Sequence, residues 1–206
     1  GRTMKILFLS LTLLLSLPVF SQDSTELTEA LKLWEKRDEK ETLKQALTKF
    51  EKARVAKPQD RDLLIYLSRG YFAYNKSKDY GLEGLSLNPQ FKKQYKGNFE
   101  KASRNLKKED MPLAFWTAAA FGRWSKLNGV MSSLQYKDKM LALITKVEEL
   151  QPDYMHGAVY RFWGGFYAVA PGFVGGDMKK SKEYFEKVFK TNPEYVGNKV
   201  GYAELY

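Results

Sequence analysis

The chain has 206 residues, a formal net charge of +10, one histidine and no cysteine. Without cysteine it cannot form disulfides or carry a lipid on an N-terminal cysteine, so its stability has to come from packing. The lone His156 argues against a histidine-based metal site or a histidine-dependent nucleophile, and we expect no metal and no cofactor. An enzyme with an unrecognised carboxylate site stays open as a weaker alternative.

Residues 1–21 have the features of a secretory signal peptide. Lys5 precedes a nearly unbroken apolar run over residues 6–17, and Pro18 and Ser21 follow it. The run is shorter than the roughly 20 residues that a bilayer span needs. The sequence therefore predicts a periplasmic protein cleaved after Ser21, with an uncleaved anchor as the alternative.

Export argues against nucleic acid as a partner. Since acids alternate with the lysines, the positive charge is more typical of a solvated helix surface than of a binding patch.

Three later segments predict amphipathic helices, each followed by a proline. They are residues 42–57, 140–150 and 181–190, before Pro58, Pro152 and Pro193. At 12, 8 and 5 positions before each proline stand Ala46, Phe50 and Ala53; Met140, Ile144 and Val147; and Ser181, Phe185 and Val188. This pattern is typical of the second helix of a tetratricopeptide unit. The prolines do not keep the standard repeat length, and no alternating strand pattern is evident. The predicted fold is all-α, an irregular tetratricopeptide-like array of helical hairpins.

Two further segments, residues 112–127 and 153–170, predict helices that are apolar on almost every face. Small residues recur in both: Ala114, Ala118 and Gly122 in the first, and Gly157, Gly164, Gly165 and Ala168 in the second. Glycine inside a helix costs roughly 1 kcal/mol relative to alanine, which close packing can offset. We therefore expect these helices to be central and to pack closely through their small residues. Charged residues bound the first too tightly for a membrane span.

The segment from Pro171 to Asp177 reads "PGFVGGD". It lacks the lysine and hydroxyl spacing of a P-loop, and no strand leads into it. We expect a shaped turn between two helices, in which Asp177 is the N-cap of the second. A phosphate site and a surface for a protein partner are the alternatives.

Three stretches together resemble one known family. They are "DYGLEGLSLNP" from Asp79, "KKEDMPLAFWTAAAFGRW" from Lys107, and "LQPDYMHGAVYRFWGGFYAVAPGFVGGDMKKSKEYFEKVF" from Leu150. They resemble the T-component family of TRAP-type transporters, in the same order along the chain. The resemblance implies a helical-repeat domain over residues 22–206. That domain is expected to be C-terminally incomplete, because the family continues beyond the helix-like "NKVGYAELY" at the end.

The resemblance also implies a function. It predicts a non-catalytic periplasmic accessory protein that binds the solute-binding subunit of the transporter. An apolar organic acid or lipid-like molecule is the expected ligand, and a homo-oligomer is left open. The alternative is a general envelope scaffold that assembles proteins without a ligand.

The residues that we expect to bind ligand or partner are mostly aromatic: Trp116, Trp124, Tyr160, Trp163, Tyr167, Phe173, Gly175, Gly176 and Asp177. For any one of the tryptophans and for Tyr167, an ordinary place in the core is the competing interpretation.

Overall fold

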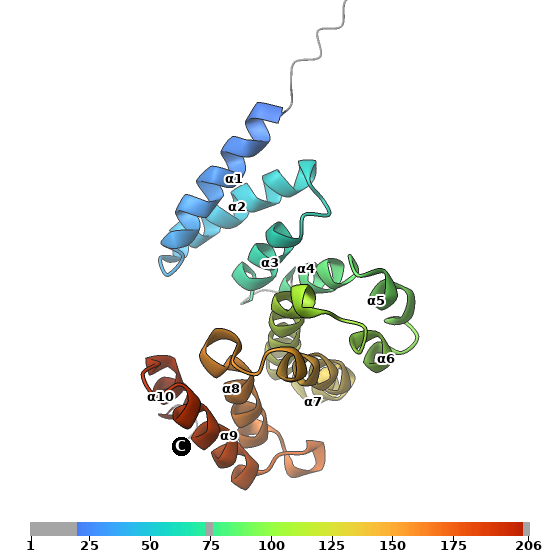
Figure 1. The fold of residues 1–206 in the computed structure, drawn as a ribbon, viewed down its shortest axis with the longest axis vertical. Helices are drawn as coiled ribbons and strands as arrows, with labels where there is room; N and C mark the ends of the chain where they lie inside the picture. The colour runs from blue at the N-terminus through green and yellow to red at the C-terminus, as the bar shows by residue number, and fades with distance from the viewer. Residues whose placement is uncertain (1–19, 73–75, 204–206) are drawn as a thin grey trace, which may run out of the picture.

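The structure is a computed structural model that describes residues 20–72 and 76–203. The predicted signal peptide lies almost wholly outside them. The described residues form helices, with no strand among them, which confirms the predicted all-α class (Figure 1). The helices are α1 Phe20–Glu35, α2 Lys40–Ala56, α3 Arg61–Gly70, α4 Lys76–Leu85, α5 Pro89–Gln94, α6 Phe99–Ser103, α7 Met111–Leu150, α8 Tyr154–Val169, α9 Met178–Thr191 and α10 Val196–Ala203, with short 3-10 turns η1 Lys108–Asp110 and η2 Gly172–Val174.

The tetratricopeptide positions are all in the core. The three predicted proline-terminated helices correspond to α2, to the second part of α7 and to α9. Each of the nine residues that precede the prolines at the signature spacing is buried. The amphipathic stripes therefore face inward as the pattern predicts, because burying them removes apolar surface from water.

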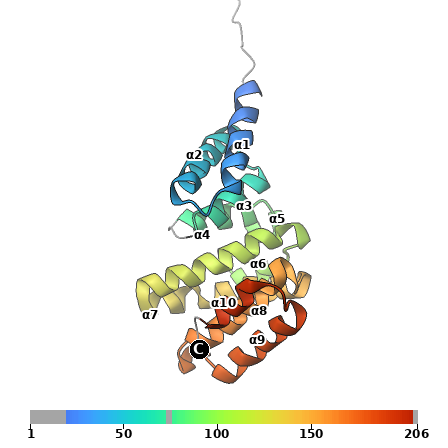
Figure 2. The ribbon, with the colours of Figure 1, turned by 90° about the vertical axis from the view of Figure 1, so that its left-hand side faces the viewer.

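The helix α7 is in fact a hairpin of two antiparallel arms, residues 111–128 and 130–150 (Figure 2). The chain reverses at Gly129, whose φ of 82° and ψ of −173° are open essentially to glycine alone. The Ser125 hydroxyl donates to the Ser132 carbonyl across the turn, and the rings of Phe121 and Tyr136 stack 4.9 Å apart. The two predicted helices at 112–127 and 140–150 are these arms.

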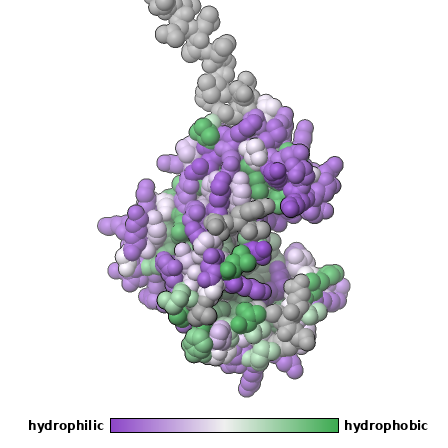
Figure 3. Space-filling view, turned by 180° about the vertical axis from the view of Figure 1, so that it is seen from behind, coloured by the Kyte–Doolittle hydropathy of each residue, from purple (hydrophilic) through white to green (hydrophobic). Residues whose placement is uncertain are grey.

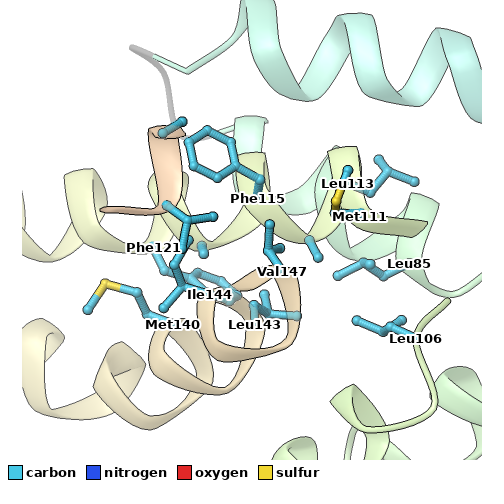
Figure 4. Packing of buried hydrophobic residues seen from close by; sticks show 14 of the residues in the cluster. Leu85, Leu106, Met111, Leu113, Phe115, Phe121, Met140, Leu143, Ile144 and Val147 are labelled. Carbon is cyan, nitrogen blue, oxygen red and sulfur yellow. The ribbon is translucent and has the colours of Figure 1, made fainter. Parts of the chain in front are cut away.

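The main core lies between the two arms of α7 and the helices beside them. Leu113 and Phe121 from the first arm and Leu143, Ile144 and Val147 from the second are fully buried (Figure 4). A second core, built by α1, α2 and α3, contains Trp34, Phe50 and Leu67. The α3 helix therefore stands between the two cores.

The network around Asp110 fixes the start of α7. Asp110 is buried and accepts hydrogen bonds from the Asn88 side chain at 2.8 Å and the Lys107 backbone at 2.9 Å, and it pairs with Arg61. A buried carboxylate is stable only with such partners. One side chain thus ties α3 and the loop before α5 to α7.

The prediction for the small residues needs a correction. Gly164 does pack closely, but against α9: a Cβ there would lie 2.5 Å from the Phe185 ring. Gly157 likewise faces Val188 of α9, and Gly122 faces Met140 within the α7 hairpin. A Cβ at Gly165 would meet nothing within 4 Å. The glycines of α8 therefore serve the α8–α9 contact rather than a crossing of α7 and α8, because α9 supplies large side chains opposite them.

The first turn of α8 is left-handed. Met155, His156 and Gly157 have φ between 46° and 75°, a region that residues other than glycine seldom occupy. Arg161 offsets the strain by donating to the backbone carbonyls of Met155, at 3.0 Å, and His156, at 2.7 Å. This explains the charged residue in an otherwise apolar helix.

Candidate binding surfaces

The structure brings three of the predicted site residues together on α8. Trp163 stacks on Tyr167 with ring centroids 5.7 Å apart, and Tyr184 of α9 stacks on both, at 6.0 and 5.7 Å. Tyr160 lies beside Tyr184 at 6.3 Å. Tyr160 and Trp163 are buried, whereas Tyr167 and Tyr184 are partly exposed. We call Tyr160, Trp163, Tyr167 and Tyr184 the α8–α9 aromatic surface.

Charges border this surface. The Trp163 Nε1 donates to Glu148 at 2.8 Å, and the Lys187 ammonium lies 4.1 Å from the centre of the Tyr160 ring. Burial and, next, the charge of Glu148 raise the pKa of Tyr184 to about 12. Like an ordinary tyrosine, Tyr184 is protonated at neutral pH and can donate a hydrogen bond to a partner.

The glycine-rich segment is a turn, as expected. Asp177 is the N-cap of α9 and accepts from the backbone N–H groups of Lys179, at 2.9 Å, and Lys180, at 3.1 Å. Gly175 has a φ of 110°, and a Cβ on Gly176 would overlap the Ala170 carbonyl. The carboxylate already occupies the helix N-terminus, where a bound phosphate would need those same N–H groups. This arrangement favours the turn over a phosphate site.

Phe173 is the exposed feature of the turn. Its side chain is 77 % exposed, although η2 around it packs Val174 inward. The turn joins the end of α8, and the Asp177 backbone N–H donates to the Tyr167 carbonyl at 2.9 Å. Phe173 therefore extends from the same end of α8 as the aromatic surface.

The other two predicted tryptophans lie elsewhere. Trp124 is half-buried in the first arm of α7, with the Lys78 ammonium 5.4 Å from its ring centre. Trp116 belongs to a separate group, in which Arg69 lies 5.2 Å from its ring centre. The predicted residues thus form more than one site.

The group around Trp116 contains residues that the sequence analysis missed. Arg69 also lies 5.5 Å from the centre of the Trp34 ring, and Tyr154 is close enough to act on its charge. Phe115 packs edge-on against both Trp116 and Tyr154, at 5.3 and 5.4 Å. We call Trp34, Arg69, Trp116 and Tyr154 the Arg69 cluster. Arg69 stands in the last turn of α3, after the apolar residues 63–67. A basic residue is common there, so the sequence carries no signal of this group.

The molecular surface is hollowed near these elements. Seen from behind, a recess separates the N-terminal helices from the C-terminal helices (Figure 3). Residues of the Arg69 cluster come from both sides: Trp34 from α1 and Arg69 from α3, and Tyr154 from α8. A second hollow of about 530 Å³ lies over α6 and the second arm of α7. It is lined by charges of both signs, including Glu100, Arg104, Asp138 and Lys146, and contains none of the predicted site residues.

Two further searches cover the part of the chain that the structure describes. Within it, His, Asp and Glu side chains do not gather in any group of three or more that could hold a metal ion. Across residues 20–72 and 76–203, no helix combines the length and the apolar character needed to cross a membrane.

The chain matches a known protein family. The family model described as TRAP transporter T-component matches residues 66–206, more than half of the chain. The matched region includes Arg69, Trp116, the α8–α9 aromatic surface and the turn at Phe173. No curated protein matches the sequence.

Proposed function

Because the chain belongs to the TRAP transporter T-component family, we propose that it is a non-catalytic periplasmic component of a TRAP-type uptake system that binds the solute-binding subunit. The family match carries the proposal. Members of the family are accessory components of the transporter, so binding rather than catalysis is the expected task. An apolar organic acid or lipid-like molecule is the proposed ligand.

The α8–α9 aromatic surface and Phe173 are the proposed contact for the solute-binding subunit. Tyrosine and tryptophan supply most of the binding energy at many protein interfaces, because they bury a large area at low entropic cost. Tyr167 and Tyr184 offer partly exposed stacked rings, and Phe173 offers a nearly free one. Val169, 62 % exposed, extends the apolar area at the end of α8.

A binding titration with the solute-binding protein of the same transporter tests this proposal. Phe173→Ala and Tyr184→Ala should each weaken the complex about tenfold or more, as truncated interface anchors do. Val55→Ala is the matched control, since Val55 is 84 % exposed on α2, far along the chain from the proposed contact. Its affinity should equal that of the unchanged protein.

Three outcomes would count against the proposal. If the solute-binding protein shows no affinity for the unchanged chain, the general envelope scaffold becomes the better account. Equal weakening by Val55→Ala and Phe173→Ala would place the contact elsewhere. Intact protein recovered from a membrane fraction, without a new N-terminus near Gln22, would contradict a cleaved periplasmic form. Sedimentation of the same samples gives the oligomeric state.

A further inference from the structure

Arg69 lies between two tryptophans at the junction of the two cores. Its guanidinium carbon is 5.5 Å from the Trp34 ring centre and 5.2 Å from the Trp116 ring centre. The next residue, Gly70, makes room for this arrangement, because a Cβ there would lie 3.0 Å from the Trp34 ring and 2.4 Å from Leu47. Trp116 is held by edge-on contacts with Phe72 and Phe115. The packing of these neighbours therefore fixes the position of the Arg69 side chain.

Among the residues that the structure describes, the charge of Arg69 has no ionic partner. Within the described ranges, neither a carboxylate nor any hydrogen-bond acceptor pairs with its guanidinium. Other partly buried arginines differ: Arg54 pairs with Glu83 and Arg61 with Asp110. Burial and, next, the positive charge of Arg37 lower the pKa of Arg69. The two nearby indole rings offset only part of the cost of removing a cation from water.

The geometry leaves one part of the guanidinium available. With an indole near it on two sides, the N–H donors at its edge remain for binding. These donors match the two oxygens of a carboxylate in one plane. Burial raises the pKa of Tyr154, against the smaller opposing effects of Arg69 and of a hydrogen bond with Trp116. As a tyrosine, it is protonated at neutral pH and its phenol can donate to an anion as well.

We propose that the Arg69 cluster binds the carboxylate of a small apolar organic acid. Arg69 pairs with the carboxylate, Tyr154 donates a hydrogen bond, and the partly exposed ring of Trp116 contacts the apolar part. Trp34 is buried, whereas Arg69 and Trp116 are partly exposed, so a ligand reaches the cluster from the side of Arg69 and Trp116. The inference deepens the proposed function and rests on it for the ligand's place in transport, but the site itself can be tested alone.

Titration of the full chain with decanoate, and separately with benzoate, tests the site. The readouts are calorimetry and tryptophan fluorescence, since Trp34 and Trp116 border the anion. Both acids should bind, and decanamide should bind about tenfold or more weakly because it lacks the charge. Arg69→Gln should lower the affinity for both acids by a similar factor, about tenfold or more, and Arg69→Lys by less. Arg104→Gln is the matched control: Arg104 is exposed and pairs with Glu100, so carboxylate affinity should not change.

The outcomes separate this site from the proposed function. Carboxylate binding lost in Arg69→Gln, with affinity for the solute-binding protein kept, supports the site. Carboxylate binding without any affinity for the solute-binding protein supports the site and counts only against the proposed function. If neither acid binds at about 10 mM, or Arg69→Lys and Arg69→Gln both bind as the unchanged protein does, the inference is wrong. Arg69→Gln could instead lower the affinity for the solute-binding protein and leave the affinity for both acids unchanged. That result would show that Arg69 contacts a carboxylate of that protein, and the inference would be wrong. Arg69→Lys keeps a positive charge at this position, so the test stands even if Arg69→Gln unfolds.

Discussion

Asp177 and the glycines before it perform separate tasks in one turn. The Asp177 carboxylate accepts two of the N–H groups that α9 leaves unpaired at its start, while Gly175 supplies a positive φ and Gly176 allows a close approach to Ala170. Sequence reasoning identified the cap from the position of an aspartate before a periodic segment, and the structure confirms it.

Replacement of Asp177 by alanine should lower the free energy of unfolding by about 1 kcal/mol, because the two N–H groups lose their acceptor. Asp177→Asn keeps an acceptor oxygen and should lie close to the unchanged protein. Urea titration of both variants provides the measurement. A loss as large in Asp177→Asn would show that the negative charge, rather than the cap, is what matters.

Gly164 and Gly165 give a matched pair on neighbouring positions of α8. Gly164→Ala places a methyl group 2.5 Å from the Phe185 ring and should cost about 1–3 kcal/mol through overpacking. Gly165→Ala meets open space and should stabilise slightly, since alanine favours the helix. Thermal melts distinguish the two. Equal midpoints would mean that Phe185 moves aside without cost.

At the scale of the elements, the α7 hairpin organises the fold. Its two arms supply ten of the 21 buried residues of the main core, and the network around Asp110 ties its start to earlier helices. Gly129 is the one residue of the turn between the arms with a non-helical backbone conformation. Hydrogen bonds from the Ser125 and Ser133 hydroxyls support this turn. A change in this one backbone position therefore affects how both arms meet.

Gly129→Ala should destabilise the protein by about 1–3 kcal/mol even though a Cβ there would touch nothing within 4 Å. The cost comes from the backbone, whose φ and ψ exclude a side chain. Gly172→Ala is the control, because Gly172 also faces open space but its φ is not in the positive region. Chemical denaturation should show a loss for Gly129→Ala only.

At the scale of the whole molecule, α3 and Tyr80 join the two cores. Tyr80 packs against both clusters, and its phenol donates to Glu51 at 2.9 Å. Burial and, next, the hydrogen bond to Glu51 raise the pKa of Tyr80 to about 12. Tyr184, in the α8–α9 aromatic surface, reaches a similar value. The integrity of the molecule should therefore depend on pH in the alkaline range.

The free energy of unfolding should fall as pH rises from about 10 to about 12. Both phenols bind their protons more tightly in the folded chain than at their ordinary value of 10.0, so the unfolded chain releases them first. Their contribution is complete below pH 10.0 and is lost as pH passes through the folded value. Tyr184→Phe should flatten this decline. Tyr80→Phe should flatten it too but also weaken the protein at neutral pH, because Glu51 loses a donor. An unchanged alkaline slope in both variants would contradict this.

The sequence by itself determined the helical class, the positions of the buried faces and the family. Spacing of apolar residues at three and four positions states which side of a helix avoids water, and that information is local. It also determined the turn at Asp177, because caps and glycine turns need only neighbours in the chain.

Only the tertiary structure decided which faces meet. The glycines of α8 pack on α9, and Trp116 lies with Trp34 and Arg69 rather than with Trp163, because docking of whole helices sets those pairs. The sequence contains no local signal for such contacts, since residues 34, 69 and 116 belong to three different helices. The unpaired charge of Arg69 likewise exists only in the folded chain, where burial removes the water that would otherwise solvate it.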